Sequence, residues 1–373
     1  MTPEELNEKL SEAFKEFQKN VKKPHILIAG PTGVGKSSLI NKIFGEKVAE
    51  EGKGEPITDS VKKYEREDLG VILYDSPGCE IGNTERFKIE VINAIQQENI
   101  HLIWYCIAST GDRIETQDKD TIKMFVEKNF PVSVVFTHCE SASEEKIKEF
   151  KEEINNNFKD IDIYITSSKV EHKIFKEEFE RLIKDAIKKL PNILRDAFIS
   201  AQKINLDEKW NRAHEIILEH SVPSFAVPFI EIFLKIPSSD APILTGNQMA
   251  MIARILYVYD LSGLENMIKG NVEGGIAGIL MSQLGKSLAF NLLELIPKIG
   301  PLLKGVIKGG VAISLTLALG EAVNFSCYKI YESVLNGNKD IEEQIKMFGD
   351  MVQKYATENV KSGKKAEDYK IPD

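Results

Sequence analysis

The eight residues at positions 30–37 constrain the fold of this chain more than any other stretch. They read Gly-Pro-Thr-Gly-Val-Gly-Lys-Ser and match the phosphate-loop pattern G-x-x-x-x-G-K-S without a mismatch. An apolar run at 25–29 precedes them, and apolar residues at helical spacing follow within 38–44. Strand, glycine loop and helix in this order form the setting that the motif requires. The sequence therefore predicts an anion-binding loop between a buried strand and a helix, rather than an ordinary glycine turn.

The chemistry of this loop follows from its residue types. Glycines let backbone N–H groups close around an anion, and the N-terminus of the following helix adds a favourable dipole. Lys36 is placed to reach the β- and γ-phosphates of a nucleotide, and the Ser37 hydroxyl to bind Mg²⁺. The predicted phosphate-binding residues are Gly30, Pro31, Thr32, Gly33, Val34, Gly35, Lys36, Ser37 and Ser38.

Composition narrows the classes of function. A length of 373 residues allows about two or three domains, and 42% hydrophobic residues allow a sizeable core. The net charge of −9 argues against a general nucleic-acid binder. The four cysteines are widely spaced, without zinc-like pairing, and suit a reducing cytosol. We see no signal peptide and no stretch of about 18 or more consecutive apolar residues, and expect a cytoplasmic protein.

Alternating elements predict an α/β domain over residues 24–190. Apolar strand-like runs alternate with charged amphipathic helices, which indicates a mostly parallel sheet with helices on both faces. A further strand at 61–66 would form an edge pair with 71–74. The predicted strands are 25–29, 71–74, 101–107, 132–136 and 161–165.

Helical segments flank this domain on both sides. Residues 1–23 predict an amphipathic helix whose apolar stripe packs on its own chain or on a partner. Residues 191–373 predict a second, all-α domain, with a long helix over 192–219 and a final one over 341–360. Between them, 243–332 is rich in Leu, Ile, Ala and Gly.

Two further motifs stand where phosphate chemistry needs them. Asp75-Ser76-Pro77-Gly78 follows the strand at 71–74, so Asp75 can hold Mg²⁺ through water. The Gly78 N–H can contact the γ-phosphate and respond to its loss. Between the loop and this strand, Thr58 is our choice for the residue that completes Mg²⁺ coordination, with Ser60 as the alternative.

Together these motifs resemble the Era-like branch of the translation-factor class of GTPases. The run Gly-Lys-Ser-Ser-Leu-Ile-Asn at 35–41 and Gly-x-Pro-x-Thr at 54–58 are typical of that branch. The resemblance covers residues 24–190 and implies a P-loop GTPase fold that binds GTP and GDP with Mg²⁺. It further implies that Lys36, Thr58 and Gly78 act in hydrolysis. The residues implied to bind Mg²⁺ are Ser37, Thr58 and Asp75.

Guanine recognition departs from the family pattern. In the family, Asn/Thr-Lys-x-Asp follows the fifth strand, whereas this chain has Thr137-His138-Cys139-Glu140 after 132–136. Glu140 can still accept hydrogen bonds from guanine, and His138 can still pack over the base. Ser167, Ser168 and Lys169 are similar to the Ser-Ala-Lys base loop of the family. We expect GTP rather than ATP, with lowered affinity.

Hydrolysis is expected to be slow. Many GTPases place a Gln after Asp-x-x-Gly to orient the attacking water, and here that position is Cys79. Dimerisation or an effector would then stimulate turnover, with Arg113 either a surface residue or an arginine finger. The alternatives are a nucleotide-holding scaffold and a P-loop ATPase. A small-molecule kinase is disfavoured by the motif at 75–78 and by the base loop.

The C-terminal half resembles a hydrophobic helical domain found after Era-like GTPase domains in several bacterial proteins. The matching features are Ala241-Pro242, Gln248 and the stretches at 295–300 and 309–320. The resemblance implies association with a membrane or a self-assembling surface. A bundle that relays the nucleotide state to a protein effector is preferred over reversible membrane insertion, because charges interrupt the long apolar runs. A homodimer remains open.

Overall fold

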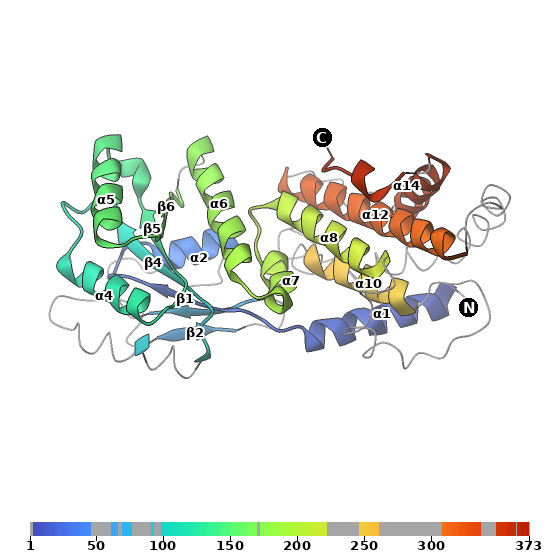
Figure 1. Cartoon of the computed structure of the whole chain (residues 1–373), viewed down its shortest axis with the longest axis horizontal. Coiled ribbons are helices and arrows are strands. Elements are labelled where there is room, and N and C mark those ends of the chain that lie inside the picture. The colour runs from blue at the N-terminus through green and yellow to red at the C-terminus, as the bar shows by residue number, and fades with distance from the viewer. Residues whose placement is uncertain are drawn as a thin grey trace. The chain divides into compact units, whose positions relative to one another are not determined.

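The computed structural model places this chain in two compact units. It describes residues 3–45, 61–65, 69–76, 91–92, 98–169, 172–221, 246–260, 308–336, 348–362 and 364–372. One unit comprises Lys22–Asn205, and the other combines Met1–Val21 with Leu206–Asp373 (Figure 1). The chain therefore begins in the unit that contains Met1–Val21, passes through the Lys22–Asn205 unit, and returns to the first of these at Leu206.

A six-stranded sheet forms the centre of the Lys22–Asn205 unit within the described residues. Its order is β2-β3-β1-β4-β5-β6. All neighbouring pairs are parallel except β2 with β3, which are antiparallel at one edge. This confirms the mostly parallel sheet and the edge pair expected from the sequence. The strands are β1 (His25–Ala29), β2 (Lys62–Tyr64), β3 (Ile72–Asp75), β4 (Leu102–Ala108), β5 (Val132–Thr137) and β6 (Asp162–Ile165).

Helices follow most of these strands, as in other parallel sheets, because a parallel connection needs a crossover. Their apolar residues recur at helical spacing, as in α6, where Phe175, Phe179, Leu182 and Ala186 are all buried. Apart from the edge strand β2, the strands are mostly apolar and buried on both faces, which is the pattern of a sheet covered on both sides. The helices are α2 (Lys36–Phe44), α4 (Thr116–Glu127), α5 (Glu144–Asn157), α6 (Lys173–Lys189) and α7 (Asn192–Ala201), with a 3₁₀ turn, η1 (Cys139–Ser141).

The described part of the other unit is helical. Its N-terminal helix, α1 (Pro3–Asn20), packs on α10 (Gly246–Val258), where the rings of Phe17 and Tyr257 meet edge to face at 5.2 Å. The apolar stripe at the N-terminus thus covers a surface of its own chain. The elements are α1 (Pro3–Asn20), α8 (Leu206–Ser221), α10 (Gly246–Val258), α12 (Lys308–Leu335), α14 (Phe348–Ser362) and η3 (Ala366–Asp368).

The helix expected over 192–219 is two helices, α7 and α8. The Gln202 side chain breaks it, because its Oε1 accepts from the backbone N–H groups of Ile204 and Asn205 at 3.0 and 2.7 Å. A glutamine that bonds neighbouring backbone groups in this way stabilises a turn instead of another helical turn. The compact units consequently divide after Asn205, whereas composition had suggested segments 1–23, 24–190 and 191–373.

The apolar stretch at 309–320 lies within α12. From Thr316 onward, this part of α12 is buried against the unit, and a Cβ on Gly320 would lie 2.7 Å from the Ile217 side chain of α8. Across the described residues, no helix has both the length and the apolarity to cross a membrane. The stretches at 274–278 and 295–300 lie outside the described residues.

Candidate nucleotide-binding site

The candidate site lies at the carboxyl ends of β1, β3, β5 and β6. Parallel strands bring the residues that follow them to one edge of the sheet, and ligands of such sheets bind there. The phosphate loop follows β1, Asp75 ends β3, and Thr137 ends β5. The sequence motifs therefore converge because of the sheet order, although they are far apart along the chain.

The phosphate loop has the backbone that its glycines allow. Gly30, Gly33 and Gly35 have φ values of 138°, 75° and 91°, a region that side chains with a Cβ rarely adopt. Gly30 also leaves no room for a side chain, because a Cβ would lie 2.3 Å from the carbonyl oxygen of Cys106 in β4. The loop thus lies directly against β4 of the sheet.

Lys36 and α2 give this loop its positive character. Lys36 is the first residue of α2, and its ammonium donates to the carbonyls of Gly30 and Pro31 at 3.1 and 3.0 Å. Within the described residues no side chain caps the first turn of α2. A lysine folded over the loop and an uncapped helix N-terminus both favour bound phosphate.

Ser37 and Asp75 form an oxygen pair beside the loop. The Ser37 hydroxyl donates to Asp75 Oδ2 at 3.2 Å, and no described residue hydrogen-bonds the buried Asp75 Oδ1. Burial raises the pKa of Asp75, and the charge of Lys36 opposes that shift. The described residues hold no cluster of three His, Cys, Asp or Glu side chains. One carboxylate with a hydroxyl suits Mg²⁺, which usually takes its other ligands from waters and phosphates.

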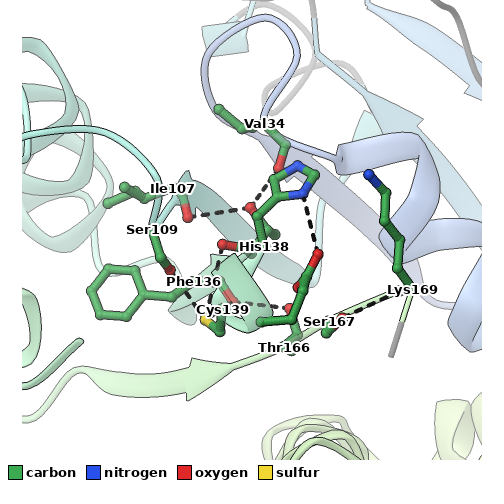
Figure 2. Close-up of polar contacts among 11 residues, drawn as sticks. Val34, Ile107, Ser109, Phe136, His138, Cys139, Thr166, Ser167 and Lys169 are labelled. Carbon is green, nitrogen blue, oxygen red and sulfur yellow. Dashed lines mark hydrogen bonds and ion pairs between the residues drawn. The ribbon is translucent and has the colours of Figure 1, made fainter. Parts of the chain in front are cut away.

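Thr137 joins the predicted base-reading segment to the phosphate loop. Its Oγ1 lies 2.5 Å from the carbonyl oxygen of Val34 and 3.3 Å from that of Ile107. The single hydroxyl proton goes to the nearer carbonyl. Figure 2 shows the resulting arrangement, with the His138 ring beside Val34. The two loops are thereby held in a fixed relation before any ligand binds.

His138 and Glu140 line the edge of the site next to this link. His138 has a left-handed backbone with φ of 55°. Its ring lies close to Gly35, because a Cβ on Gly35 would be 3.2 Å from His138 Nε2. Glu140 Oε1 lies 4.0 Å from His138 Nδ1. Its other oxygen, Oε2, is buried and has no hydrogen-bond partner among the described residues. A buried carboxylate oxygen without a donor is costly, and a ligand that supplies a donor would remove that cost.

The second predicted base loop lies against the same segment. Thr166 accepts a backbone hydrogen bond from Cys139 at 3.2 Å, so the residues after β5 and β6 are tied together. Ser167 is buried and its Oγ accepts from the Lys169 N–H at 3.2 Å, whereas Ser168 and Lys169 are exposed. The sequence alone did not indicate that Cys139 also anchors this region. Its thiol lies 3.1 Å from Ser109 Oγ and donates to the carbonyl of Phe136 (Figure 2).

Several predicted positions lie outside the described residues or outside the site. Thr58, its alternative Ser60, Gly78 and Cys79 all fall on residues that the structure does not describe. Arg113 is exposed and pairs with Glu115 at 3.3 Å. The structure thus brings together the phosphate loop, Asp75 and the two segments after β5 and β6 that were predicted to read the base.

Comparison with known proteins decides the family. Residues 25–138 match the family described as 50S ribosome-binding GTPases. The probable GTP-binding protein EngB of Wolbachia pipientis wMel is 31% identical over 168 residues, which are 42% of this chain and 84% of EngB. The chain belongs to the Era- and EngB-like family of P-loop GTPases.

Other members of this GTPase family are more distant. EngB of Aquifex aeolicus is 29% identical over 43% of this chain and 90% of its own length. The Era structure with MgGDPNP and nucleotides 1506–1542 of 16S ribosomal RNA shares 23% identity, with a TM-score of 0.37. That match covers 46% of this chain and 58% of the Era chain. The family match is confined to the first half of this chain, about residues 25–165.

Proposed function

We propose that this chain is a GTP-dependent switch that hydrolyses GTP slowly and relays its nucleotide state to the helical unit. The observation that carries the choice of guanine is the buried Glu140 Oε2, which has no hydrogen-bond partner among the described residues. Its neighbour His138 lies next to Gly35 of the phosphate loop. Guanine presents an N1–H and an exocyclic amine to such an acceptor, whereas adenine presents an unprotonated N1 on that edge. His138 packs over the base, and Ser167, Ser168 and Lys169 complete its surroundings.

The phosphate loop and the metal pair supply the rest of the proposed chemistry. Lys36 stabilises negative charge on the phosphates, and Ser37, Thr58 and Asp75 hold Mg²⁺. Bound Mg²⁺ would neutralise charge that develops on the phosphate oxygens. The Gly78 N–H contacts the γ-phosphate, so its loss releases the segments around Thr58 and Gly78.

Slow turnover follows from Cys79, which stands where many family members have the water-orienting Gln. A thiol is a poorer hydrogen-bonding group than an amide, so an effector or a second copy of the chain would supply what is missing. The proposed location is the cytoplasm, with a peripheral membrane position as the alternative for the helical unit. Fast GTP turnover by dilute monomer alone would contradict slow intrinsic hydrolysis. Liposome co-sedimentation with GTP and with GDP tests the membrane alternative.

The substitution Lys36→Ala tests the switch directly. Loss of the ammonium removes the cation that faces the phosphates, so we expect GTP and GDP affinity to fall by about 100-fold or more, as for a lost charge-assisted contact of roughly 3 kcal/mol. Calorimetry with Mg²⁺ and with EDTA measures this. Lys148→Ala in α5 is the matched control, because this exposed lysine pairs with Glu152 on the surface of the same helix. Unchanged GTP affinity in Lys36→Ala would contradict the assignment of the site.

A nucleotide-holding scaffold is the second candidate. Cys79 and the altered Thr137-His138-Cys139-Glu140 segment favour it, because both depart from the pattern of hydrolysing members. A scaffold would keep its interaction with a partner or membrane in Lys36→Ala, whereas a switch would lose the nucleotide response. The two candidates are thus separated by one variant.

A further inference from the structure

The amino end of β3 touches both chain segments that lead to the helical unit. The Ile72 N–H donates to the carbonyl of Pro24 at 2.9 Å, and Pro24 belongs to the short link between α1 and β1. A Cβ on Gly70 would lie 2.2 Å from the carbonyl oxygen of Ala197 in α7. Backbone therefore meets backbone at Gly70, and this contact has no flexible side chain that could absorb a shift.

α7 also touches the far end of α2. The Lys203 N–H, just after α7, donates to the carbonyl of Ile43 at 3.0 Å. The rings of Phe44 and Phe198 meet edge to face at 6.2 Å. Since α2 begins at Lys36 and β3 ends at Asp75, the two elements that reach α7 each carry nucleotide-binding groups at their other ends.

Gln202 holds the turn that follows α7. This side chain is fully buried. It accepts from the N–H groups of Ile204 and Asn205, and its Nε2 donates to the carbonyl of Asn205 at 2.9 Å. One side chain thus holds the turn that ends at Asn205, and α8 of the helical unit begins at the next residue.

We infer that α7 and the Gln202 turn are the element through which the nucleotide site acts on the helical unit. The inference rests on the proposed switch and names its route. A shift of β3 or α2 between the GTP and GDP states would displace α7, because the Gly70–Ala197 contact leaves no space. The Gln202 turn would pass that displacement to Leu206, the next residue in the chain, where α8 begins.

The two tryptophans of the chain allow a direct test. Trp210 lies buried in α8, and Trp104 lies in β4. In a Trp104→Phe background, Trp210 alone reports on the helical unit, and its emission is compared with GDP and with a non-hydrolysable GTP analogue. Gly70→Ala inserts a methyl group between the segment that precedes β3 and α7. Gln202→Ala removes the side-chain hydrogen bonds that hold the turn. Gly111→Ala is the matched control, because its Cβ would meet only atoms at 3.6 Å or more.

We expect the difference in Trp210 emission between the nucleotides to shrink about two-fold or more in Gly70→Ala and in Gln202→Ala, and to persist in Gly111→Ala. Calorimetry on each variant shows that nucleotide still binds. Hydrogen exchange of α8 gives the same comparison for any variant with altered emission. A full nucleotide response in both Gly70→Ala and Gln202→Ala would overturn the route. A parent protein that binds GTP and GDP without any response in α8 would instead overturn the relay itself.

Discussion

At the scale of single residues, the site depends on a few polar atoms with defined partners. The Thr137 hydroxyl reaches the carbonyl of Val34, and Ser37 reaches Asp75. By contrast, the buried Glu140 Oε2 and Asp75 Oδ1 have no hydrogen-bond partner among the described residues. The satisfied groups hold the loops, and in the proposed function Glu140 Oε2 would receive the base and Asp75 Oδ1 would face the metal ion.

Replacing Glu140 tests the proposed guanine reading. Hydrogen bonds to a charged acceptor contribute about 1.5–3 kcal/mol, so Glu140→Ala should weaken GDP binding by about 10-fold or more. ADP binding should change little, because adenine has neither the N1–H nor the 2-amino group that Glu140 would accept from guanine. Calorimetry with both nucleotides measures the two effects. Glu115→Ala, at an exposed glutamate, is the control, and an equal loss for GDP and ADP would argue against base reading.

Replacing Thr137 tests the link between the two loops. Thr137→Val keeps the shape of the side chain and removes the donor to Val34, which should cost about 1 kcal/mol, or roughly five-fold in nucleotide affinity. Thr121→Val in α4 removes a similar buried hydroxyl, whose 2.8 Å bond goes to the Gln117 carbonyl far along the chain from either loop. If both variants bind nucleotide as the parent does, the link has no role in holding the site.

Sequence reasoning predicted the loop and its strand–loop–helix setting because the motif is local, and the structure shows that setting. The order of residues 30–37 predicts the loop, its glycines and the role of Lys36 without knowledge of the fold. Contacts between distant segments were out of reach, since no local pattern signals that Cys139 lies beside Ser109 or that Gly35 lies beside His138. Such pairs depend on strand order and register, which tertiary packing decides.

At the scale of elements, buried polar groups join the helices of the second unit. The buried Glu321 of α12 binds His214 of α8 and accepts from Asn324 at 3.3 Å. Tyr259, after α10, donates to Asn324 at 2.6 Å. A chain of this kind fixes the register of α8 on α12, because each group would otherwise be buried without a partner.

The His214–Glu321 pair predicts a pH dependence of stability. Its hydrogen bond with Glu321 raises the pKa of His214 above its ordinary value near 6.5. The stabilisation is therefore fully present below about pH 6.5 and is lost as pH rises through the higher folded-state pKa. Urea unfolding of the full chain across this range should show that His214→Gln costs most at low pH.

Burial and the Arg254 charge lower the pKa of His220 on the same helix. The contribution of His220 to stability therefore changes with pH in the opposite direction to that of His214. Stability from the neutral His220 is fully present above about pH 6.5 and is lost as pH falls from there through the lower folded-state pKa, so its variant separates the two effects. His172→Gln in the other unit is a control for the loss of any histidine. A cost of His214→Gln that is the same at every pH would contradict the ion pair.

At the scale of the whole molecule, the chain crosses between its two units twice. Composition suggested a boundary near residue 190, because the charged helices of the first half end there. Packing places the division after Asn205 and groups α1 with the C-terminal helices. Composition reports which residues are apolar but not which surface they cover, so the partner of α1 could only be found in the structure.

The central claim is that this chain binds guanine nucleotides at the loop of residues 30–37. The most direct measurement is a calorimetric titration of the full chain with GTP, GDP, ATP and ADP in the presence of Mg²⁺. We predict binding of GTP and GDP and at least about 10-fold weaker binding of ATP and ADP, since the guanine edge alone satisfies Glu140. Equal affinity for both bases, or a preference for adenine, would contradict the account.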